Sequence, residues 1–302
     1  MSPLQVPLII DTDVALGVIH EGRPRDIDDG FAIVEAINSD EIELKVLTTV
    51  FGNGPLLEVN RVAREIIDLK QVDVPVTAGA AERLPVSGRL PETNEAATAI
   101  AAWLREGPCH IAAIGPLTNI GLLVHHYPDV LDNIESVIIV AGRSRDAEFY
   151  IGSAGPVRDF NFENDVRAAD LLLSSNVPVV MAGFELTSQV SVGESDLRTI
   201  AESSSPTARY FYDNSLAWCR YWTGEFPSDA GFHPWDSAAI SWLKHPEYFR
   251  FEPRGWQIRQ LADDRYWLEC DPDLPGRQVT YCTGFQPGGE EAFVIDIVDN
   301  VY

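Results

Sequence analysis

The stretch Val6-Pro7-Leu8-Ile9-Ile10-Asp11-Thr12-Asp13 decides the fold, because an apolar run passes directly into two aspartates. Short runs rich in Ile and Leu are typical of strands that are buried on both faces of a parallel sheet. Asp11 and Asp13 therefore mark the carboxyl end of the first strand. In open α/β sheets, that end faces the edge at which ligand-binding groups gather.

A second acidic run, Asp26-Ile27-Asp28-Asp29, precedes a helical pattern that extends to Ala36. The two acidic runs together hold five aspartates, and Arg23 and Arg25 are the only cations between them. Like charges at close range raise one another's pKa, so a fold that gathers these carboxylates is expected to bind a cation. Hard oxygen ligands favour Ca²⁺ or Mg²⁺ over softer metals.

Apolar runs and helical patterns alternate outward from this point. The strands are expected at residues 8–11, 44–50, 74–78, 110–114, 136–141 and 177–182. The helices are expected at residues 28–36, 55–70, 95–105, 117–126, 165–173, 206–222 and 236–243. This alternation predicts an α/β fold with a mainly parallel central sheet flanked by helices. After Phe249 the pattern becomes antiparallel, which we interpret as a small edge of the same domain, so residues 1–302 are expected to form one domain.

Polar residues follow several of these strands at the point where each one ends. Thr48, Thr49 and Asn53 close the second strand, and the run Gly115-Pro116-Leu117-Thr118-Asn119 follows the fourth. Because parallel strands bring their carboxyl ends to one edge, these groups and the first aspartates are expected to share a site.

The composition of the 302-residue chain narrows the classes of partner. A formal net charge of −24 opposes binding to nucleic acids or anionic membranes. The chain has no apolar run of about eighteen residues and no signal-peptide pattern at its start. Its four cysteines are scattered, which disfavours zinc and a disulfide framework. We therefore expect a cytoplasmic protein that binds a small molecule.

Taken together, the motifs resemble those of the nucleoside hydrolases, the inosine–uridine type of ribonucleoside N-glycosidases. The resemblance covers about residues 6–245 and is weaker beyond them. It rests on the order and context of Asp11-Thr12-Asp13, Asp28-Asp29, residues 48–53, residues 115–119, Asp159-Phe160-Asn161 and Trp235-Asp236.

The resemblance implies a Rossmann-like nucleoside hydrolase fold and an enzyme that hydrolyses ribonucleosides to ribose and free base. One Ca²⁺ would be held by Asp13, Asp29 and Asp236 and by the backbone carbonyl of Thr118. A water on the metal would be the nucleophile, with Asp13 as its base and Asn53 orienting Asp13 or the water. The protein is expected to act in purine salvage and to form a homodimer or homotetramer.

A further set of residues would contact the nucleoside. Asp28 and Asn161 would bind the ribose 2′- and 3′-hydroxyls. Asp159 replaces the usual glutamate of the family, and Ser153 replaces an asparagine, so both changes fall where the 5′ end of the ribose is recognised. Trp235 stands where many members have a histidine as leaving-group acid. A purine-preferring branch also carries tryptophan there and stacks the base on it, so a purine ribonucleoside is the favoured substrate.

Two segments allow more than one interpretation. The link from Val14 to Ile27 is about eleven residues longer than the three-residue link usual in the family. It is either a surface excursion or a flap whose His20 or arginines touch the substrate. Phe211, Trp218 and Trp222 lie at helical spacing and form either core or a wall against the base.

Two other functions fit parts of the sequence. A relative that binds nucleosides or sugars without turnover would explain the changes at Asp159, Ser153 and Trp235. The DxD sequence at Asp11–Asp13 also fits an aspartyl-phosphate phosphatase, but that mechanism needs a lysine after a later strand. Lysines occur only at positions 45, 70 and 244, and none follows a suitable strand.

Overall fold

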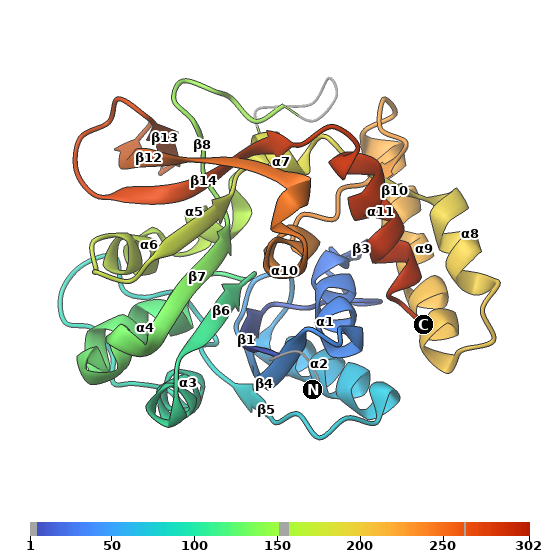
Figure 1. Cartoon of the computed structure of the whole chain (residues 1–302), viewed down its shortest axis with the longest axis horizontal. Helices are drawn as coiled ribbons and strands as arrows, with labels where there is room; N and C mark the ends of the chain where they lie inside the picture. The colour runs from blue at the N-terminus through green and yellow to red at the C-terminus, as the bar shows by residue number, and fades with distance from the viewer. Residues whose placement is uncertain (1–4, 151–156, 263) are drawn as a thin grey trace.

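The centre of the fold is a mainly parallel sheet, seen in a computed structural model that describes residues 5–150, 157–262 and 264–302 (Figure 1). Its parallel part has the strand order β5-β4-β1-β6-β7-β9. These strands confirm all six that the sequence predicts, with small differences in their bounds. They are β1 (Val6–Thr12), β4 (Ile42–Thr49), β5 (Val76–Ala78), β6 (Cys109–Ala113), β7 (Ile134–Val140) and β9 (Val179–Ala182).

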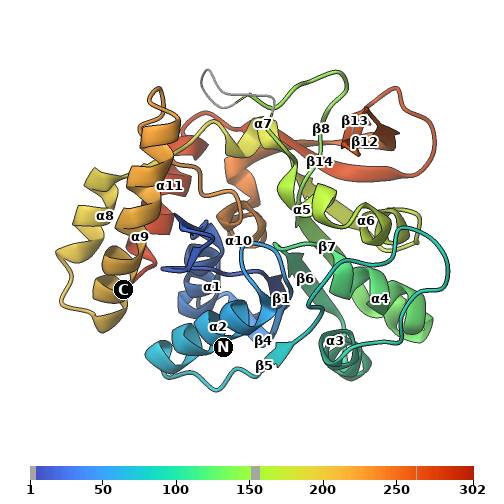
Figure 2. The same cartoon turned by 180° about the vertical axis from the view of Figure 1, so that it is seen from behind.

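Helices cover both faces of this sheet, as Figures 1 and 2 show. Side chains alternate across each strand, so Leu8 and Ile10 enter one core while Ile9 enters the other. The first core is completed by α1 (Asp28–Asn38), α2 (Leu56–Lys70), α9 (Pro206–Glu225), α10 (Ser237–Lys244) and α11 (Gly289–Asp299). The second core is completed by α3 (Glu95–Glu106), α4 (Thr118–His126) and α6 (Val166–Leu173).

The C-terminal strands extend the sheet instead of forming a separate unit. Strand β14 (Gln278–Phe285) pairs parallel with β9 and antiparallel with β12 (Phe249–Gln260). β12 then pairs antiparallel with β13 (Tyr266–Asp271), and β13 pairs with the short β8 (Arg143–Ser144). The predicted antiparallel edge is therefore confirmed, and it continues the main sheet.

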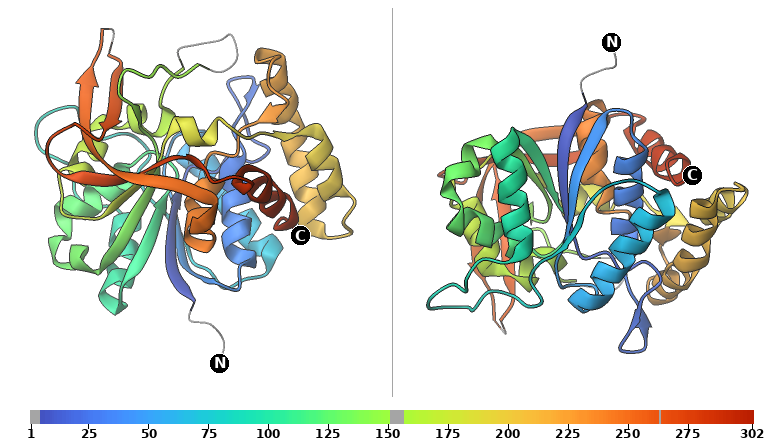
Figure 3. Two further views of the ribbon diagram at one scale, coloured as in Figure 1. Left: turned by 45° about the horizontal axis from the view of Figure 1, so that its top comes forward. Right: turned by 90° about the horizontal axis from the view of Figure 1, so that it is seen from below.

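The segment inserted between Asp13 and Asp28 forms a hairpin. Its strands are β2 (Ile19–His20) and β3 (Arg23–Pro24), joined by Glu21 and Gly22. Both turn residues have positive φ, as the type I′ turn of a two-residue hairpin requires. Figure 3 shows the hairpin, in blue, standing beside α9.

The remaining elements are short or lie in the connections. They are α5 (Phe160–Asn164), α7 (Phe184–Thr187), α8 (Glu194–Ala201), β10 (Val192–Gly193), β11 (Gly231–Phe232), η1 (Pro128–Asn133) and η2 (Pro246–Tyr248). Within the described ranges, no helix combines the length and the apolar character needed to cross a bilayer.

Candidate active site

Asp11 braces the end of β1. It pairs in register with Thr48 on β4, and its Oδ1 accepts hydrogen bonds from the Thr48 hydroxyl at 2.6 Å and from Asn119 Nδ2 at 2.8 Å. Burial raises the pKa of the Asp11 carboxyl to about 7, and these two hydrogen bonds oppose the shift. Asp11 thus ties together the ends of two strands and the start of α4, and it lies behind the site.

Asp13 is held by the loop that follows β4. Its Oδ2 accepts a hydrogen bond from the backbone N–H of Asn53 at 2.6 Å, and its own backbone N–H donates to Asp29 Oδ1 at 3.2 Å. Gly52 makes the approach possible, because a Cβ there would lie 1.9 Å from Asp13 Oδ2. The predicted link between Asn53 and Asp13 therefore exists through the backbone of Asn53.

Three further carboxylates meet where two helices begin. Asp28 and Asp29 open α1, and Asp236 directly precedes α10. Each offers a carboxylate oxygen, and these oxygens lie within 4.8 Å of one another. The backbone N–H of Asp236 donates to Asp28 Oδ2 at 3.0 Å, and the Thr12 hydroxyl donates to Asp29. Residues separated by more than 200 positions thus share one buried acidic cluster.

The electrostatics of this cluster favour a bound cation. Burial raises the pKa of the Asp29 carboxyl to about 7, and the charge of Asp28 adds to the shift. Burial and then the charge of Asp29 hold the pKa of Asp13 well above its ordinary value, and Asp236 is shifted in the same direction by burial and its acidic neighbours. Asp13 Oδ1 and Asp29 Oδ2 are buried and accept no hydrogen bond from the described residues.

A cavity of about 330 Å³ opens above these acids. Asp13, Asp28 and Asp236 contribute to its lining, together with Asn53. One wall is aromatic and comes mostly from α9; it consists of Trp218, Tyr221, Trp222, Phe226 and Trp235. The lining also contains the stacked rings of Phe149 and Phe184, whose centroids lie 3.9 Å apart.

The structure brings most of the predicted substrate residues to this cavity. Asp28, Asp159, Asn161 and Trp235 all line it. Asn161 Nδ2 donates to the Ile114 carbonyl at 2.8 Å, and Asp159 Oδ2 accepts from the Gly142 N–H at 2.8 Å. Burial raises the pKa of Asp159 to about 6. Ser153 lies outside the described residues.

Two predicted metal ligands are not in the cavity lining. Asp29 lies just below it, in contact with Asp13. Thr118 lies farther back as the first residue of α4, where its hydroxyl donates to Asp165 Oδ2 at 2.7 Å. Ile114, four residues earlier, does line the cavity, and its carbonyl accepts the hydrogen bond from Asn161 Nδ2.

The inserted segment was interpreted either as a surface excursion or as a flap whose His20 or arginines touch the substrate. Arg23 and Arg25 line the cavity, together with Asp26, whereas His20 is not part of the lining, so the insertion forms part of the cavity wall. Asp26 hydrogen-bonds Asp28, and burial followed by the charge of Asp28 raises the pKa of Asp26 well above its ordinary value. For Asp26, the only signal in the sequence was its position at the start of the acidic run. Phe149 and Phe184 carried no signal, because they lie in segments without a regular pattern.

The aromatic stripe on α9 serves both of the roles considered for it. Phe211 is fully buried and packs against Phe31, whereas Trp218 and Trp222 are largely buried and also line the cavity. Trp235 packs edge-on against Trp222 at 5.2 Å, and its Nε1 has no hydrogen-bond partner among the described residues.

Comparisons with known proteins agree with this site. The sequence model of the inosine-uridine preferring nucleoside hydrolases matches residues 8–285. The chain is 28% identical over 270 residues to the pyrimidine-specific ribonucleoside hydrolase RihA of Salmonella typhimurium, covering 82% of each protein. Its fold resembles the plant nucleoside hydrolase PpNRh1 (TM-score 0.82, 20% identity, 99% of each chain). It also resembles the purine-preferring ribonucleoside hydrolase from Gardnerella vaginalis (TM-score 0.80, 21% identity, 98% of this chain and 99% of that one).

Proposed function

Because the chain belongs to the inosine-uridine preferring nucleoside hydrolases, which are hydrolases of N-glycosyl compounds, we propose that it cleaves purine ribonucleosides using one bound Ca²⁺. The observation that carries the proposal is the buried cluster of aspartates beneath an aromatic cavity. Family membership replaces the two other functions that fitted parts of the sequence, the non-catalytic binding protein and the aspartyl-phosphate phosphatase.

The residues present fit a hard divalent cation. Asp13 Oδ1 and Asp29 Oδ2 are buried carboxylate oxygens without a donor among the described residues, which is costly unless a cation occupies the space between them. All the candidate side-chain ligands are oxygens, as Ca²⁺ and Mg²⁺ prefer. Ca²⁺ is the better match for a site assembled from four separate chain segments, because it tolerates irregular geometry.

We assign the ligands to the carboxylates of Asp29 and Asp236, whose oxygens lie together with that of Asp28, and to one backbone carbonyl. Asp13 is not part of that group of three, but it contacts Asp29 through its backbone N–H, and we keep it as the third carboxylate ligand. For that carbonyl we replace Thr118 by Ile114, because Ile114 lines the cavity, whereas Thr118 begins a helix behind it. When bound, the cation would lower the pKa of a water molecule and so favour its attack on the sugar.

Asp13 is the proposed general base. The backbone N–H of Asn53 donates to its Oδ2, which fixes the orientation of the carboxylate that would take the proton. As the glycosidic bond breaks, positive charge develops on the ribose, and the surrounding carboxylates stabilise it. Asp28 and the free carbonyl oxygen of the Asn161 side chain would bind ribose hydroxyls.

The preference for purines rests on the aromatic wall. A purine has a larger ring surface than a pyrimidine, and the rings of Trp218, Trp222 and Trp235 offer it extended stacking. Trp235 would thus assist departure of the base by stacking, in place of a side-chain acid. His233 does not compete for that role, because its Nδ1 is 2.6 Å from the Val190 carbonyl and its Nε2 is 3.3 Å from Asp229.

A reducing-sugar assay over a panel of purine and pyrimidine ribonucleosides tests the proposal. We expect sugar release from purine ribonucleosides, loss of release after chelation and recovery with Ca²⁺. Trp235→Ala should reduce turnover of purines more than turnover of pyrimidines. Activity that survives complete chelation would refute the metal assignment, and equal losses on both base classes would refute the stacking role.

The remaining expectations are a cytoplasmic location, a role in purine salvage and a homodimer or homotetramer. Light scattering on the purified protein would decide its oligomeric state.

A further inference from the structure

We propose that the cavity accepts a ribonucleoside bearing an anionic group on its 5′ carbon, namely a nucleoside 5′-monophosphate, and that Arg158 binds the phosphate. This inference rests on the proposed function and specifies its substrate class. It starts from the side chains found where the 5′ end of the ribose would lie.

Arg158 lies at that end of the cavity. It lines the cavity and directly precedes Asp159, the residue expected to meet the 5′ end of the ribose. One oxygen of Asp159 is engaged, because its Oδ2 accepts the Gly142 N–H at 2.8 Å. Arg158 has no hydrogen-bond or ion-pair partner among the described residues, although the chain as a whole is strongly acidic. An unpaired guanidinium group is therefore available next to a carboxylate that keeps only one oxygen for a ribose hydroxyl.

A second arginine adds positive charge behind this end of the cavity. Arg143 is fully buried, with its guanidinium carbon 3.7 Å from the ring centre of Phe149 and 4.6 Å from that of Trp267. Its Nε and Nη2 have no hydrogen-bond partner among the described residues, and its charge acts on Asp159. Phe149 lines the cavity, so the ring of Phe149 separates the positive charge of Arg143 from the cavity.

The inserted hairpin brings another cation to the same cavity. Arg23 lines it and, like Arg158, has no partner among the described residues. Arg25 also lines the cavity, but its Nη2 is engaged by Glu21 at 3.2 Å. The insertion thus offers one free guanidinium and one that is partly neutralised.

These cations match a phosphate better than a neutral nucleoside. A nucleoside carries no charge for them to neutralise, whereas a phosphate monoester carries about −1.5 to −2 charges at pH 7 and three strong acceptor oxygens. The planar guanidinium group suits two-point binding to phosphate oxygens. The carboxylates of the metal site would be balanced by the cation that they hold, and the charge of Asp159 is opposed by that of Arg143.

The atoms, electrons and protons of the reaction are all accounted for with this substrate. Water adds its oxygen to C1′, the bond between C1′ and the base nitrogen breaks, and the bonding electrons leave with the base. One proton of the water passes to Asp13, and the base gains a proton from solvent. The phosphate ester stays intact, so the products are ribose 5-phosphate and the free base.

The test compares inosine 5′-monophosphate with inosine on the Ca²⁺-loaded full chain. We expect kcat/KM to be about tenfold or more higher for the nucleotide, which is the effect of one charge-assisted contact. Arg158→Ala should lower kcat/KM for the nucleotide by about 10- to 100-fold, with a much smaller loss for inosine, and Arg158→Lys should restore part of it. Arg83→Ala is the matched control, because Arg83 is an exposed arginine without a described partner outside the cavity.

A binding measurement separates this inference from the proposed function. Ribose 5-phosphate should stabilise the wild type against heat more than ribose does, and Arg158→Ala should abolish the difference. Cleavage of inosine with no preference for the nucleotide, or equal losses on both substrates in Arg158→Ala, overturns the phosphate site and leaves the nucleosidase intact. Failure to cleave either substrate would instead refute the proposed function.

Discussion

At the scale of single residues, the position of Asp13 depends on two glycines that leave room for it. A Cβ on Gly52 would lie 1.9 Å from Asp13 Oδ2, and one on Gly115 would lie 3.1 Å from Oδ1 and 2.9 Å from the Asp13 backbone nitrogen. The carboxylate therefore sits in a slot between two loops that follow neighbouring strands. The orientation of the Asp13 carboxylate therefore depends on the lack of side chains at Gly52 and Gly115 as well as on the hydrogen bond from the Asn53 N–H.

Gly52→Ala should consequently inactivate the enzyme while the fold is retained. The new methyl group must displace the Asp13 carboxylate, and misplacement of a reacting group by about 1 Å can lower the rate by about 100-fold. The measurement is kcat on inosine, with circular dichroism to confirm folding.

Gly54→Ala is the control for this substitution. Its Cβ would meet Val59 at 3.8 Å, which is ordinary van der Waals contact. We expect activity close to that of the wild type. A Gly52→Ala variant that is as active as Gly54→Ala would show that the orientation of Asp13 does not depend on this slot.

Residue identities were largely predictable for the acids and poorly predictable for the cavity walls. The spacing of Asp11, Asp13, Asp28 and Asp29 placed them at a strand end and a helix start, where the structure has them. Asn53 acts through its backbone, which no residue pattern reveals. Phe149 reaches the cavity through packing between segments distant in sequence, so it was missed.

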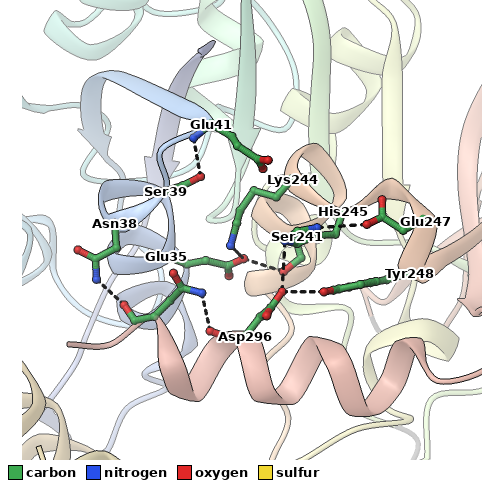
Figure 4. A network of polar contacts seen from close by, with 11 residues as sticks. Glu35, Asn38, Ser39, Glu41, Ser241, Lys244, His245, Glu247, Tyr248 and Asp296 are labelled. Atoms are coloured by element: carbon green, nitrogen blue, oxygen red, sulfur yellow. Dashed lines mark hydrogen bonds and ion pairs between the residues drawn. The ribbon is translucent and has the colours of Figure 1, made fainter. Parts of the chain in front are cut away.

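At the scale of elements, two helices carry the acidic cluster, and a buried polar network joins them. Glu35 lies on α1, and its Oε1 accepts from Ser241 Oγ at 2.8 Å and from Lys244 Nζ at 3.2 Å on α10. Figure 4 shows these residues next to Asp296 of α11, which Tyr248 contacts at 3.0 Å. The network sets the spacing of α1 and α10, and thereby that of Asp29 and Asp236.

Lys244→Met should therefore destabilise the protein and weaken its metal site. It leaves Glu35 buried without its cation, a change that typically costs about 3–5 kcal/mol. The side chains of Glu35 and Lys244 are only 1% and 6% exposed, so solvent cannot replace the lost partner. Urea unfolding measures the free energy of unfolding.

The double variant Glu35→Leu/Lys244→Met supplies the internal comparison. With both charges removed, much of the lost stability should return, because no unpaired ion stays buried. A double variant as unstable as Lys244→Met would mean that the loss came from packing and not from the ion pair.

The helices and strands that could be predicted are those with a clear pattern of apolar residues. The six parallel strands were predicted from short apolar runs, and the structure contains each of them. The hairpin of β2 and β3 is too short to show periodicity, although Glu21-Gly22 adopts a turn that glycine favours. Helices α8 and α11 were missed because their amphipathic patterns are brief and follow segments without regular signals.

At the scale of the whole molecule, one sheet collects strands from residue 6 to residue 285. We propose on this basis that the chain folds as a single domain. The sheet gathers buried acids in a protein whose net charge is already −24. Without a cation, ionisation of these acids opposes folding.

Stability of the metal-free protein should accordingly fall as pH rises. Asp11 and Asp29 have an ordinary pKa of 3.8, and burial raises it to about 7 in the folded chain. The folded state therefore binds more protons than the unfolded state between these values. By linkage, the free energy of unfolding decreases with pH across that window.

Excess Ca²⁺ should weaken this trend, because the metal replaces the proton on Asp29, whereas Asp11 is not a ligand. Thermal unfolding at pH 5 and pH 8, with chelator and with Ca²⁺, measures both effects. The stabilisation by Ca²⁺ should be larger at pH 8. Metal-free stability that increases over this pH range would contradict the interpretation.

The central claim is that acids from distant parts of the chain bind one divalent cation beneath the cavity. Its most direct test is a calorimetric titration of Ca²⁺ into chelator-treated wild type and into Asp29→Asn. We expect one Ca²⁺ per chain in the wild type and markedly weaker binding in the variant. Absence of binding to the wild type, or equal binding to both proteins, would contradict it.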